Sequence, residues 1–299
     1  MTLTITSVNV NGIRAAVKQR NDENPGMLGW LRDSGSDVVL LQEVRATIEE
    51  TEAALAPVLA EGWHYVGAPA AAKGRAGVGI LSRRPLENVR IGFGSFPDAG
   101  RWIEGSLDQV RLASLYLPSG SAGTEKLDEK YRFLDEFSQV LDDRAETYPE
   151  MVIGGDWNIC HRREDLKNWK TNRKKSGFLP EERDFMDSVF GVFPDEQPQE
   201  KPGLGDYFGV VDYAGRDVRG TAAQPRWFDV GRRLQPEGEG PYTWWTFRGQ
   251  AFNNNAGWRI DYQAATGAML ERAERSWVDR ASSVETRWSD HAPLNVSYR

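Results

Sequence analysis

Short runs of apolar residues, bounded by glycine and polar residues, recur along the whole chain and predict β-strands. We expect strands at residues 3–10, 37–42, 64–67, 78–82, 110–117, 151–155, 242–247, 259–265 and 294–298. Helical spacing and capping-type sequences predict helices at residues 27–33, 48–60, 124–147 and 180–189. Strands thus outnumber helices by about two to one, which disfavours a simple alternating doubly wound fold and favours two packed β-sheets with helices outside.

We expect the 299 residues to form a single domain, 1–299, with a large core. Residues 193–241 differ from the rest because they are rich in proline, glycine and charge and hold only short apolar runs. A long segment of this composition predicts a surface excursion with a little structure of its own. No repeat of fixed period and no low-complexity tract stands out in the sequence.

Charge and cysteine content narrow the function classes. The formal net charge of -7 argues against a non-specific nucleic-acid coat, although it permits a local basic face. The lone cysteine, Cys160, excludes an internal disulfide and a metal site built on thiolates. Neither a secretory leader nor an apolar segment near the ~20 residues of a membrane span is present, so we expect a cytoplasmic protein with no membrane partner.

Asp156 and Asn158 directly follow the buried strand predicted at residues 151–155. Positions two apart on an extended chain face the same side, so the two residues would present a carboxylate and an amide together. Such a pair can hold a water molecule and a phosphate oxygen at once. The structural alternative is an Asx turn that ends the strand.

Three more polar residues follow predicted strands. Glu43 ends the apolar run at residues 37–42, where a solvated strand end is the structural alternative. Asn9 and Asn11 flank Val10 after the first strand, and their amides could orient a carboxylate or contact phosphate. Asn11 precedes a glycine, so a simple turn is the alternative at that position.

His291 is one of three histidines and lies between Asp290 and an Ala-Pro pair just ahead of the last strand. Asp261 interrupts a strand whose neighbours are apolar or aromatic, and a carboxylate in that setting needs a partner. We expect Asp261 and His291 to form an oriented carboxylate–imidazole pair.

Residues 162–175 hold seven lysines or arginines against two acids, with Trp169 among them. A charge run is often only a solvated face, but this run follows Asp156 and Asn158 and is well placed to hold a phosphate backbone. The candidate DNA-binding residues are Arg162, Arg163, Lys167, Lys170, Arg173, Lys174 and Lys175. Trp244, Trp245 and Trp258, near Asp261 in the sequence, could wall a pocket or stack on a base or sugar.

Carboxylates, amides and an imidazole at the ends of strands are the inventory of a metal-assisted phosphodiester hydrolase. The sequence contains no G-x-S-x-G elbow, no G-x-x-x-x-G-K-[ST] loop and no H-E-x-x-H motif. The hydrolase interpretation therefore has no competing catalytic motif.

Seven motifs, in the correct order from residue 8 to residue 293, resemble those of one known family. They are Val8-Asn-Val-Asn-Gly-Ile-Arg14, Leu41-Gln-Glu43, Gly77-Val-Gly-Ile-Leu-Ser82, Gly154-Gly-Asp-Trp-Asn158, Phe178-Leu-Pro-Glu-Glu-Arg183, Gly257-Trp-Arg-Ile-Asp261 and Ser289-Asp-His-Ala-Pro293. The chain resembles the exonuclease III family of apurinic/apyrimidinic endonucleases, within the endonuclease/exonuclease/phosphatase superfamily.

This resemblance implies a four-layered α/β sandwich, with two packed mixed β-sheets flanked by helices. It also implies a magnesium-dependent DNA-repair hydrolase, with Mn²⁺ as a substitute, that cuts the backbone 5′ to abasic sites. The expected partner is duplex DNA with abasic or 3′-blocked sites, from which 3′ nucleotides or blocking groups are also removed, and the expected state is a monomer.

The resemblance also implies roles for particular residues. The implied metal ligands are Glu43 and Asp290, with Asn11 beside them. The implied catalytic and phosphate-contacting residues are Asp156, Asn158, His291, Asp261, Tyr116 and Asn9. A small apolar pocket for a flipped-out abasic sugar would be lined by Trp244, Trp258 and Ile260. Whether Asp156 or His291 takes the proton from water stays open.

Three features depart from the family pattern. Ser119 stands where relatives commonly have Asn or Gln, Arg45 replaces a usual lysine, and the segment near residues 197–226 is longer than in compact relatives. The main alternative is an enzyme of the same fold, a nuclease or phosphatase without abasic-site preference. A DNA-binding or scaffold protein that has lost catalysis is the alternative from another class.

Overall fold

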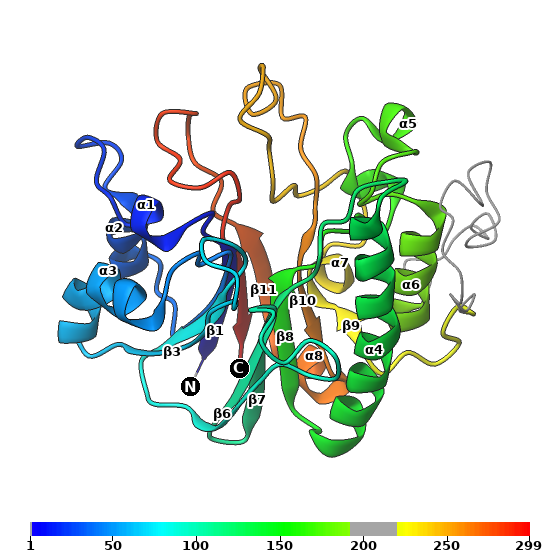
Figure 1. Cartoon of the computed structure of the whole chain (residues 1–299), viewed down its shortest axis with the longest axis horizontal. Helices are drawn as coiled ribbons and strands as arrows, with labels where there is room; N and C mark the ends of the chain where they lie inside the picture. Colours follow the sequence, from blue (N-terminus) through cyan, green and yellow to red (C-terminus); the bar gives the residue numbers. More distant parts are fainter. Residues whose placement is uncertain (1, 192–219) are drawn as a thin grey trace.

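The computed structural model describes residues 2–191 and 220–299, and the described strands form two six-stranded mixed sheets (Figure 1). The first sheet has the order β11-β12-β1-β2-β4-β3, with β1 Leu3–Asn9, β2 Val38–Gln42, β3 His64–Ala68, β4 Val78–Ser82, β11 Ala273–Val278 and β12 Leu294–Tyr298. The second has the order β5-β6-β7-β8-β10-β9, with β5 Glu87–Ile91, β6 Trp102–Leu107, β7 Val110–Tyr116, β8 Met151–Asp156, β9 Phe228–Asp229 and β10 Asp261–Ala265. In each sheet one central pair is parallel, β1 with β2 and β7 with β8.

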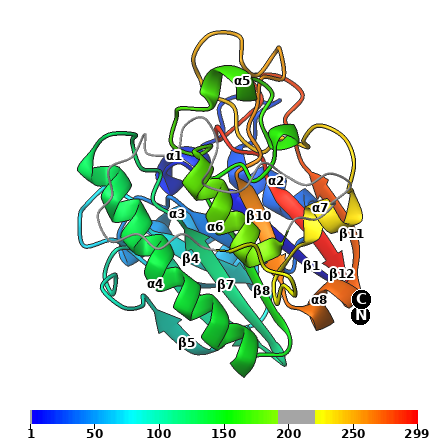
Figure 2. The same cartoon turned by 90° about the vertical axis from the view of Figure 1, so that its right-hand side faces the viewer.

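Helices cover the outer face of each sheet (Figures 1 and 2). The first sheet carries α1 Ile13–Ala16, α2 Gly26–Asp33 and α3 Ile48–Ala60. The second carries α4 Glu125–Thr147 and α6 Pro180–Phe190. Shorter helices are α5 Trp169–Asn172, α7 Val230–Leu234 and α8 Gly267–Arg272, with a 3-10 turn at Arg163–Asp165. The four layers confirm the expected α/β sandwich.

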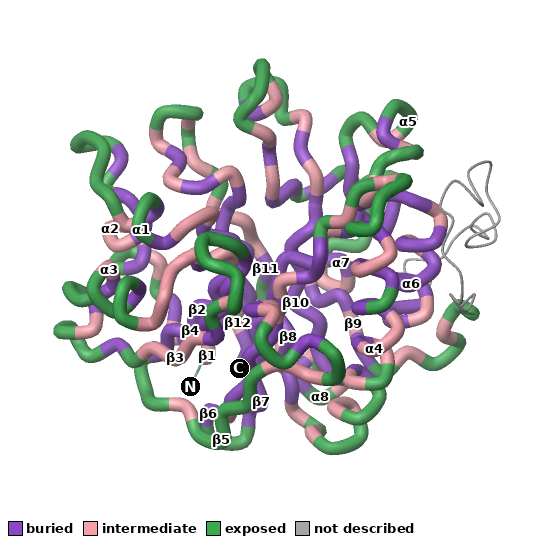
Figure 3. Tube along the Cα trace, viewed as in Figure 1, coloured by how far each residue is buried: buried purple, intermediate pink, exposed green. Residues whose placement is uncertain are grey.

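Burial follows this layering, since the strands are largely buried and the loops above them are more exposed (Figure 3). One apolar cluster lies between the sheets and includes Ile5, Leu40, Leu112 and Val152. The other large clusters lie between each sheet and its helices. Each sheet thus buries both faces, which explains why its central strands read as continuous apolar runs.

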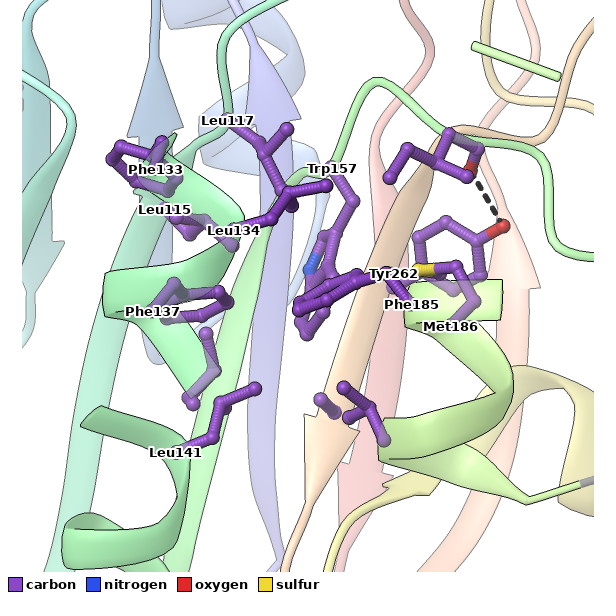
Figure 4. Packing of buried hydrophobic residues seen from close by; sticks show 14 of the residues in the cluster. Leu115, Leu117, Phe133, Leu134, Phe137, Leu141, Trp157, Phe185, Met186 and Tyr262 are labelled. Carbon is purple, nitrogen blue, oxygen red and sulfur yellow. Dashed lines mark hydrogen bonds between the residues drawn. The ribbon is translucent and has the colours of Figure 1, made fainter. Parts of the chain in front are cut away.

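Trp157 anchors the loop after β8 in the core (Figure 4). Its side chain is 0% exposed and packs between Phe137 of α4 and Tyr262 of β10, with ring centroids 5.6 and 5.9 Å away. A fully buried side chain between Asp156 and Asn158 limits how far these two residues can move. The core packing therefore supports the position of the polar residues beside it.

Several predicted elements match the structure closely, including the strands at residues 78–82 and 294–298 and the helix at 48–60. The strand predicted at residues 242–247 is wrong, since this segment makes only isolated bridges through Trp244. The sequence also failed to indicate β5, β6, β9 and β11.

The predicted surface excursion, residues 193–241, lies partly outside the described residues. Its last part has some structure of its own, because Phe228–Asp229 forms β9 and Val230–Leu234 forms α7. Trp227 is 3% exposed and packs in the core under α4. Among the described residues, no helix combines the length and apolarity that a membrane crossing would require.

A buried ion-pair network ties the loop after β8 to β10 and α7. Asp165, which is 0% exposed, accepts from Arg259 Nε at 2.7 Å and from Arg232 Nη2 at 2.5 Å. Arg259 also pairs with Asp229 at 2.6 Å. Burial alone would raise the pKa of Asp165, but the guanidinium groups of Arg259 and Arg232 outweigh it and hold that pKa well below its usual value.

We expect Asp165→Asn to lower the free energy of unfolding by about 3 kcal/mol at pH 7, because it leaves two buried guanidinium groups without their shared carboxylate. The lowered pKa means that this stabilisation is present above pH ~4, the usual pKa of Asp, and is lost as the pH falls further. Urea denaturation of wild type and variant at several pH values measures both effects.

The matched control is Asp108→Asn, which breaks the exposed ion pair between Asp108 and Arg84. It should change the free energy of unfolding by less than about 1 kcal/mol. An Asp165→Asn protein as stable as this control would contradict the role of the network.

Candidate active site

Six strands bring the predicted polar residues to one edge of the molecule. Asn9 ends β1, Glu43 follows β2, Tyr116 ends β7 and Asp156 ends β8. The antiparallel neighbours contribute from their starts, with Asp261 opening β10 and the Asp290–His291 pair preceding β12. Glu43, Tyr116, Asp156, Asp290 and His291 line a cleft of about 710 Å³, whose wall also includes Asn11, Arg45, Ser119, Asn158, Trp244 and Trp258. Asn9 and Asp261 are fully buried and contact the lining residues through hydrogen bonds.

The Asn9 amide joins the two sheets at this edge. Its Nδ2 donates to Glu43 Oε1 at 2.8 Å and to Asp156 Oδ2 at 2.9 Å, while the side chain is fully buried. Asn9 Oδ1 accepts from the backbone N–H of Asn11 at 2.9 Å. One amide therefore separates two carboxylates that would otherwise repel each other.

The expected Asp261–His291 contact is present in the structure. His291 Nδ1 lies 2.8 Å from Asp261 Oδ2, and its Nε2 lies 3.7 Å from Asp156 Oδ2. Burial would lower the pKa of His291, but the carboxylates of Asp261 and Asp156 together raise it well above its usual value. Burial raises the pKa of Asp156, although His291 opposes that rise. Asp156 can thus exchange a proton near neutral pH.

The implied metal ligands have their own set of donors. Arg45 pairs with Glu43, while Asp290 accepts from Asn11 Nδ2 at 2.9 Å and from Trp244 Nε1 at 3.0 Å. Both carboxylates line the cleft. Oxygen atoms of two carboxylates, with an amide nearby, are suited to a hard divalent cation. The residues present therefore fit a metal at Glu43 and Asp290.

A second set of residues also has metal-ligand geometry. Among the described residues, ligand atoms of Asp156, Asp261 and His291 all lie within 4.8 Å of one another. The neighbouring carboxylates raise the pKa of His291 and favour a protonated imidazole, and a protonated nitrogen does not ligate a cation. The edge of the sheets thus offers two candidate groups for a cation, Glu43 with Asp290, and Asp156 with Asp261 and His291.

Four cleft residues other than glycine have left-handed backbone conformations that L-residues rarely adopt. The φ angles are +48° at Asn11, +48° at Glu43, +53° at Arg45 and +51° at Asn158. Hydrogen bonds support the unusual backbone, including one from Asn158 Nδ2 to the carbonyl of Leu117 at 2.8 Å. Such conformations concentrate at functional sites, which strengthens the assignment of this cleft.

The predicted pocket residues lie together at the cleft. The rings of Trp244 and Trp258 meet edge to face with centroids 5.9 Å apart, and Ile260 completes the apolar wall. Trp244 has a second function that the sequence did not indicate, because its indole N–H donates to Asp290. This residue therefore connects the apolar wall to the candidate metal site.

Only part of the basic loop, residues 162–175, is exposed to solvent. Arg163, Lys167, Lys170, Lys174 and Lys175 are exposed, and Lys175 also lines the cleft. The prediction that Arg162 contacts DNA is wrong, because its side chain is 5% exposed and lies near the buried acids Asp165, Asp187 and Asp229. Burial of one side chain in a charged run cannot be read from local sequence.

The sequence did not indicate Arg101. Its guanidinium lies 5.1 Å from the centroid of the Tyr116 ring, and Nη1 donates to the Tyr116 carbonyl at 3.3 Å. Burial, with the charges of Glu43 and Asp156, raises the pKa of Tyr116 well above its usual value. Tyr116 therefore stays a phenol at neutral pH and can donate a proton or a hydrogen bond. The sequence gave little reason to select Arg101, because it is a single basic residue directly before β6, a strand that was not predicted.

An α/β sandwich with carboxylates, amides and an imidazole at the common edge of its sheets has the architecture of the phosphoester hydrolases. The chain matches the model of the Endonuclease/Exonuclease/phosphatase family over residues 6–291 and belongs to that family. Enzymes of this family depend on a metal ion.

Individual relatives resemble the chain over nearly its whole length. The exodeoxyribonuclease of Bacillus subtilis is 28% identical over 98% of this chain and 98% of its own. The DNA-(apurinic or apyrimidinic site) endonuclease of Dictyostelium discoideum is also 28% identical, over 98% of this chain and 69% of its own. The solved structure of the 3′ phosphatase NExo from Neisseria, bound to product DNA hairpin, superposes with a TM-score of 0.79 at 23% identity, covering 99% of both chains. That likeness supports the fold.

We expect Asp261→Asn to shift the pKa of His291 toward or below its usual value of about 6.5, because the nearest carboxylate is removed. In the wild type the imidazole should instead stay protonated through neutral pH. Because the chain has 3 histidines, NMR titration of the imidazole signals in the presence of chelator can follow His291 directly.

Asp187→Asn is the control for this titration, since Asp187 contacts His161 at 2.6 Å and not His291. It should leave the His291 signal unchanged. A wild-type His291 that titrates near pH 6.5 would show that Asp261 does not control its charge.

Proposed function

We propose that this chain is a magnesium-dependent DNA-repair phosphodiesterase. It hydrolyses the backbone 5′ to abasic sites in duplex DNA, leaves a 3′ hydroxyl, and also removes 3′ nucleotides or blocking groups. The observation that carries the proposal is the Asn9-bridged carboxylate set, which lies beside the Asp261–His291 pair in a cleft walled by indole rings. The names of the Bacillus and Dictyostelium relatives support the same reading.

Glu43 and Asp290, with Asn11 beside them, would hold Mg²⁺, or Mn²⁺ as a substitute. When bound, the cation supplies Lewis-acid stabilisation of charge on the phosphate and on the leaving oxygen. Arg45 pairs with Glu43 and contributes a further positive charge at the same place.

The chain's own residues carry the remaining steps of hydrolysis. Asp156, whose pKa is raised by burial, orients the attacking water and is suited to take its proton. His291, kept protonated by Asp261 and Asp156, donates to a phosphate oxygen, as does the amide of Asn158. Both N–H groups of the Asn9 amide already donate to Glu43 and Asp156, so Asn9 positions these carboxylates instead of contacting the phosphate. Tyr116, a neutral phenol, donates to the leaving oxygen. Each donor faces a point where negative charge builds up.

Abasic selectivity is assigned to the apolar wall formed by Trp244, Trp258 and Ile260. A pocket walled by two indole rings would admit a sugar without a base and reject one that still carries its base. The exposed lysines and arginines of residues 163–175 would hold the DNA backbone next to this pocket. Duplex DNA is thus the proposed partner of a protein that acts as a monomer. Its buried thiol, Cys160, fits the reducing cytoplasm.

The alternative is a nuclease or phosphatase of the same fold without abasic-site preference. The fold likeness to a 3′ phosphatase bound to a DNA hairpin makes this the specific competitor. A binding protein without catalysis is less favoured, because hydrogen bonds join the carboxylates, amides and imidazole into one arrangement.

We expect the purified protein to cut a duplex that carries one tetrahydrofuran abasic analogue, in the presence of Mg²⁺, and to leave an undamaged duplex intact. Tetrahydrofuran cannot undergo β-elimination, so a cut at that site reports hydrolysis. Excess chelator should abolish the cut, and Glu43→Gln and Asp156→Asn should each lower kcat by about 10²–10³-fold.

Digestion of both duplexes from their 3′ ends would instead support an exonuclease without abasic preference. No turnover of either duplex would reject the proposed reaction.

We also expect Lys170→Ala combined with Lys175→Ala to weaken duplex binding and make it less salt-dependent. Each phosphate contact contributes about 0.9 to the slope of log K against log salt, so two lost contacts should lower that slope by about 1.8. Fluorescence anisotropy with labelled duplex and chelator measures binding without turnover.

Arg90→Ala on the exposed strand β5 is the control, because β5 lies at the far edge of the second sheet and does not line the cleft. It should leave the slope unchanged. An equal effect of both changes would mean that the basic loop makes no particular contact with DNA.

A further inference from the structure

Lys130 of α4 carries a fully buried ammonium group next to the cleft loops. Its Nζ donates to Glu182 Oε1 at 2.6 Å and to the backbone carbonyl of Asn158 at 3.0 Å. The carbonyl of Ser119 and the hydroxyl of Ser176 each lie 3.4 Å away. A buried ammonium persists only when it is paired and hydrogen-bonded. Here its partners come from α6 and from three loops that line the cleft.

Glu182 arranges the loop that precedes α6. Its Oε2 accepts from the backbone N–H groups of Gly177 at 2.6 Å and Leu179 at 2.9 Å. Its Oε1 lies 2.8 Å from the Ser176 hydroxyl, which in turn donates to the Ser119 carbonyl at 2.6 Å. The Phe178–Arg183 motif, which the mechanism leaves without a role, therefore supplies the counter-ion of Lys130.

Two glycines show how closely these loops approach the pair. A Cβ on Gly177, at φ +97°, would lie 2.9 Å from the Trp258 ring and 3.3 Å from the Asn158 carbonyl. A Cβ on Gly120, at φ +69°, would lie 3.0 Å from the Lys130 side chain. The loops after β7, after β8 and before α6 are therefore closely packed around these residues, and all three contact the Lys130 ammonium.

We infer that Lys130, paired with Glu182, is a positioning residue that holds Asn158 in its catalytic conformation. The Asn158 backbone, at φ +51°, is one that L-residues rarely adopt, and the ammonium binds its carbonyl directly. The same ammonium sets the Ser119 and Ser176 walls of the cleft. This inference rests on the proposed function, because that proposal assigns Asn158 to the scissile phosphate.

A comparison pair exists at the other end of the second sheet. Arg111, near the start of β7, and Glu104 of β6 form an ion pair of 3.1 Å with side chains 1% and 0% exposed. Neither residue lines the cleft. Replacing both members of a buried pair by neutral groups of similar size avoids leaving an unpaired buried charge. Arg144, the second partner of Glu104, keeps its contact with Asp143, so matched double variants can keep the fold and remove the ionic contacts.

The experiment compares Lys130→Met/Glu182→Gln with Glu104→Gln/Arg111→Met, using the full chain and the tetrahydrofuran duplex with Mg²⁺. Misplacing a catalytic group by about 1 Å can lower the rate by about 10²-fold. We therefore expect kcat of the Lys130 variant to fall by about 10–100-fold with KM changed less than about threefold, measured well below its melting temperature. The control should keep kcat within about twofold, even if its melting temperature falls equally. Equal kcat in both variants would overturn the inference.

Amide hydrogen exchange gives a second readout that does not depend on activity. In the wild type the N–H of Cys160 donates to the Gly177 carbonyl at 2.8 Å, and Gly177 and Leu179 donate to Glu182. These three amides should exchange at least about tenfold faster in the Lys130 variant, while amides of β1 stay unchanged. Unchanged protection at all three would also overturn the inference.

If the wild type does not cut the tetrahydrofuran duplex, the proposed function fails, and hydrogen exchange still decides whether the pair holds these loops. If the double variant does not fold, Glu182→Gln alone is measured in the same two ways. It keeps the ammonium on Asn158 and removes its charged partner, so exchange at Gly177 and Leu179 should rise and kcat should fall several-fold. No change in either quantity would reject the positioning role.

Discussion

The side-chain amide of Asn9 links the two sheets at the edge where the cleft lies. It donates to Glu43 at the end of the first sheet and to Asp156 at the end of the second, so a fully buried group fixes the distance between the sheet edges. Strand register supports the same arrangement, since Asn9 lies opposite Gln42 and Asp156 lies opposite Asp261. A one-residue slip in either pairing would turn the carboxylates away from the cleft.

At three places in the described part of the molecule, a buried charged side chain is stabilised by groups of opposite charge. In the cleft, the protonated His291 lies between Asp261 and Asp156. Outside it, Asp165 joins two arginines and Lys130 joins loops that have little regular structure. Ionic contacts thus give these loops the rigidity that backbone ladders give to strands. This explains how long segments without helix or strand can hold functional groups in place.

Much of the fold was predictable because its central strands are buried on both faces. The runs at β2 and β4 are apolar without interruption, and carboxylates or amides appear where such runs stop. The strands that were not predicted, β5, β6, β9 and β11, lack such a continuous apolar run. β5 is exposed at every position, and β6 carries a fully buried Glu104 whose charge is balanced by the distant Arg111 and Arg144. The apolar run at Trp244 failed in the opposite sense, because its rings pack against loops instead of joining a ladder.

The sequence predicted that polar residues from several strand ends come together, but it did not predict the residues that support them. Asp261 and His291 could be paired from the sequence because a carboxylate inside an apolar strand needs a partner. Arg162 could not be placed, since two of the acids that surround it, Asp187 and Asp229, are distant in the sequence. Lys130 gave no signal at all, because a lysine in an amphipathic helix normally faces solvent. Long-range partners decided both outcomes.

Core and site also share the same stretch of backbone, which constrains what this edge of the molecule can tolerate. Trp157 packs fully inside the second sheet's helical layer while Asp156 and Asn158 on either side face the cleft. Asn9 likewise lies between two core residues, Val8 and Val10, whose side chains are buried under the first sheet's helices. A change in packing at Trp157 therefore reaches two polar residues at once. The positions of the cleft residues therefore depend on packing in the core. The left-handed backbone at Asn158 is held by the buried side chain of Trp157 and by the buried ammonium of Lys130.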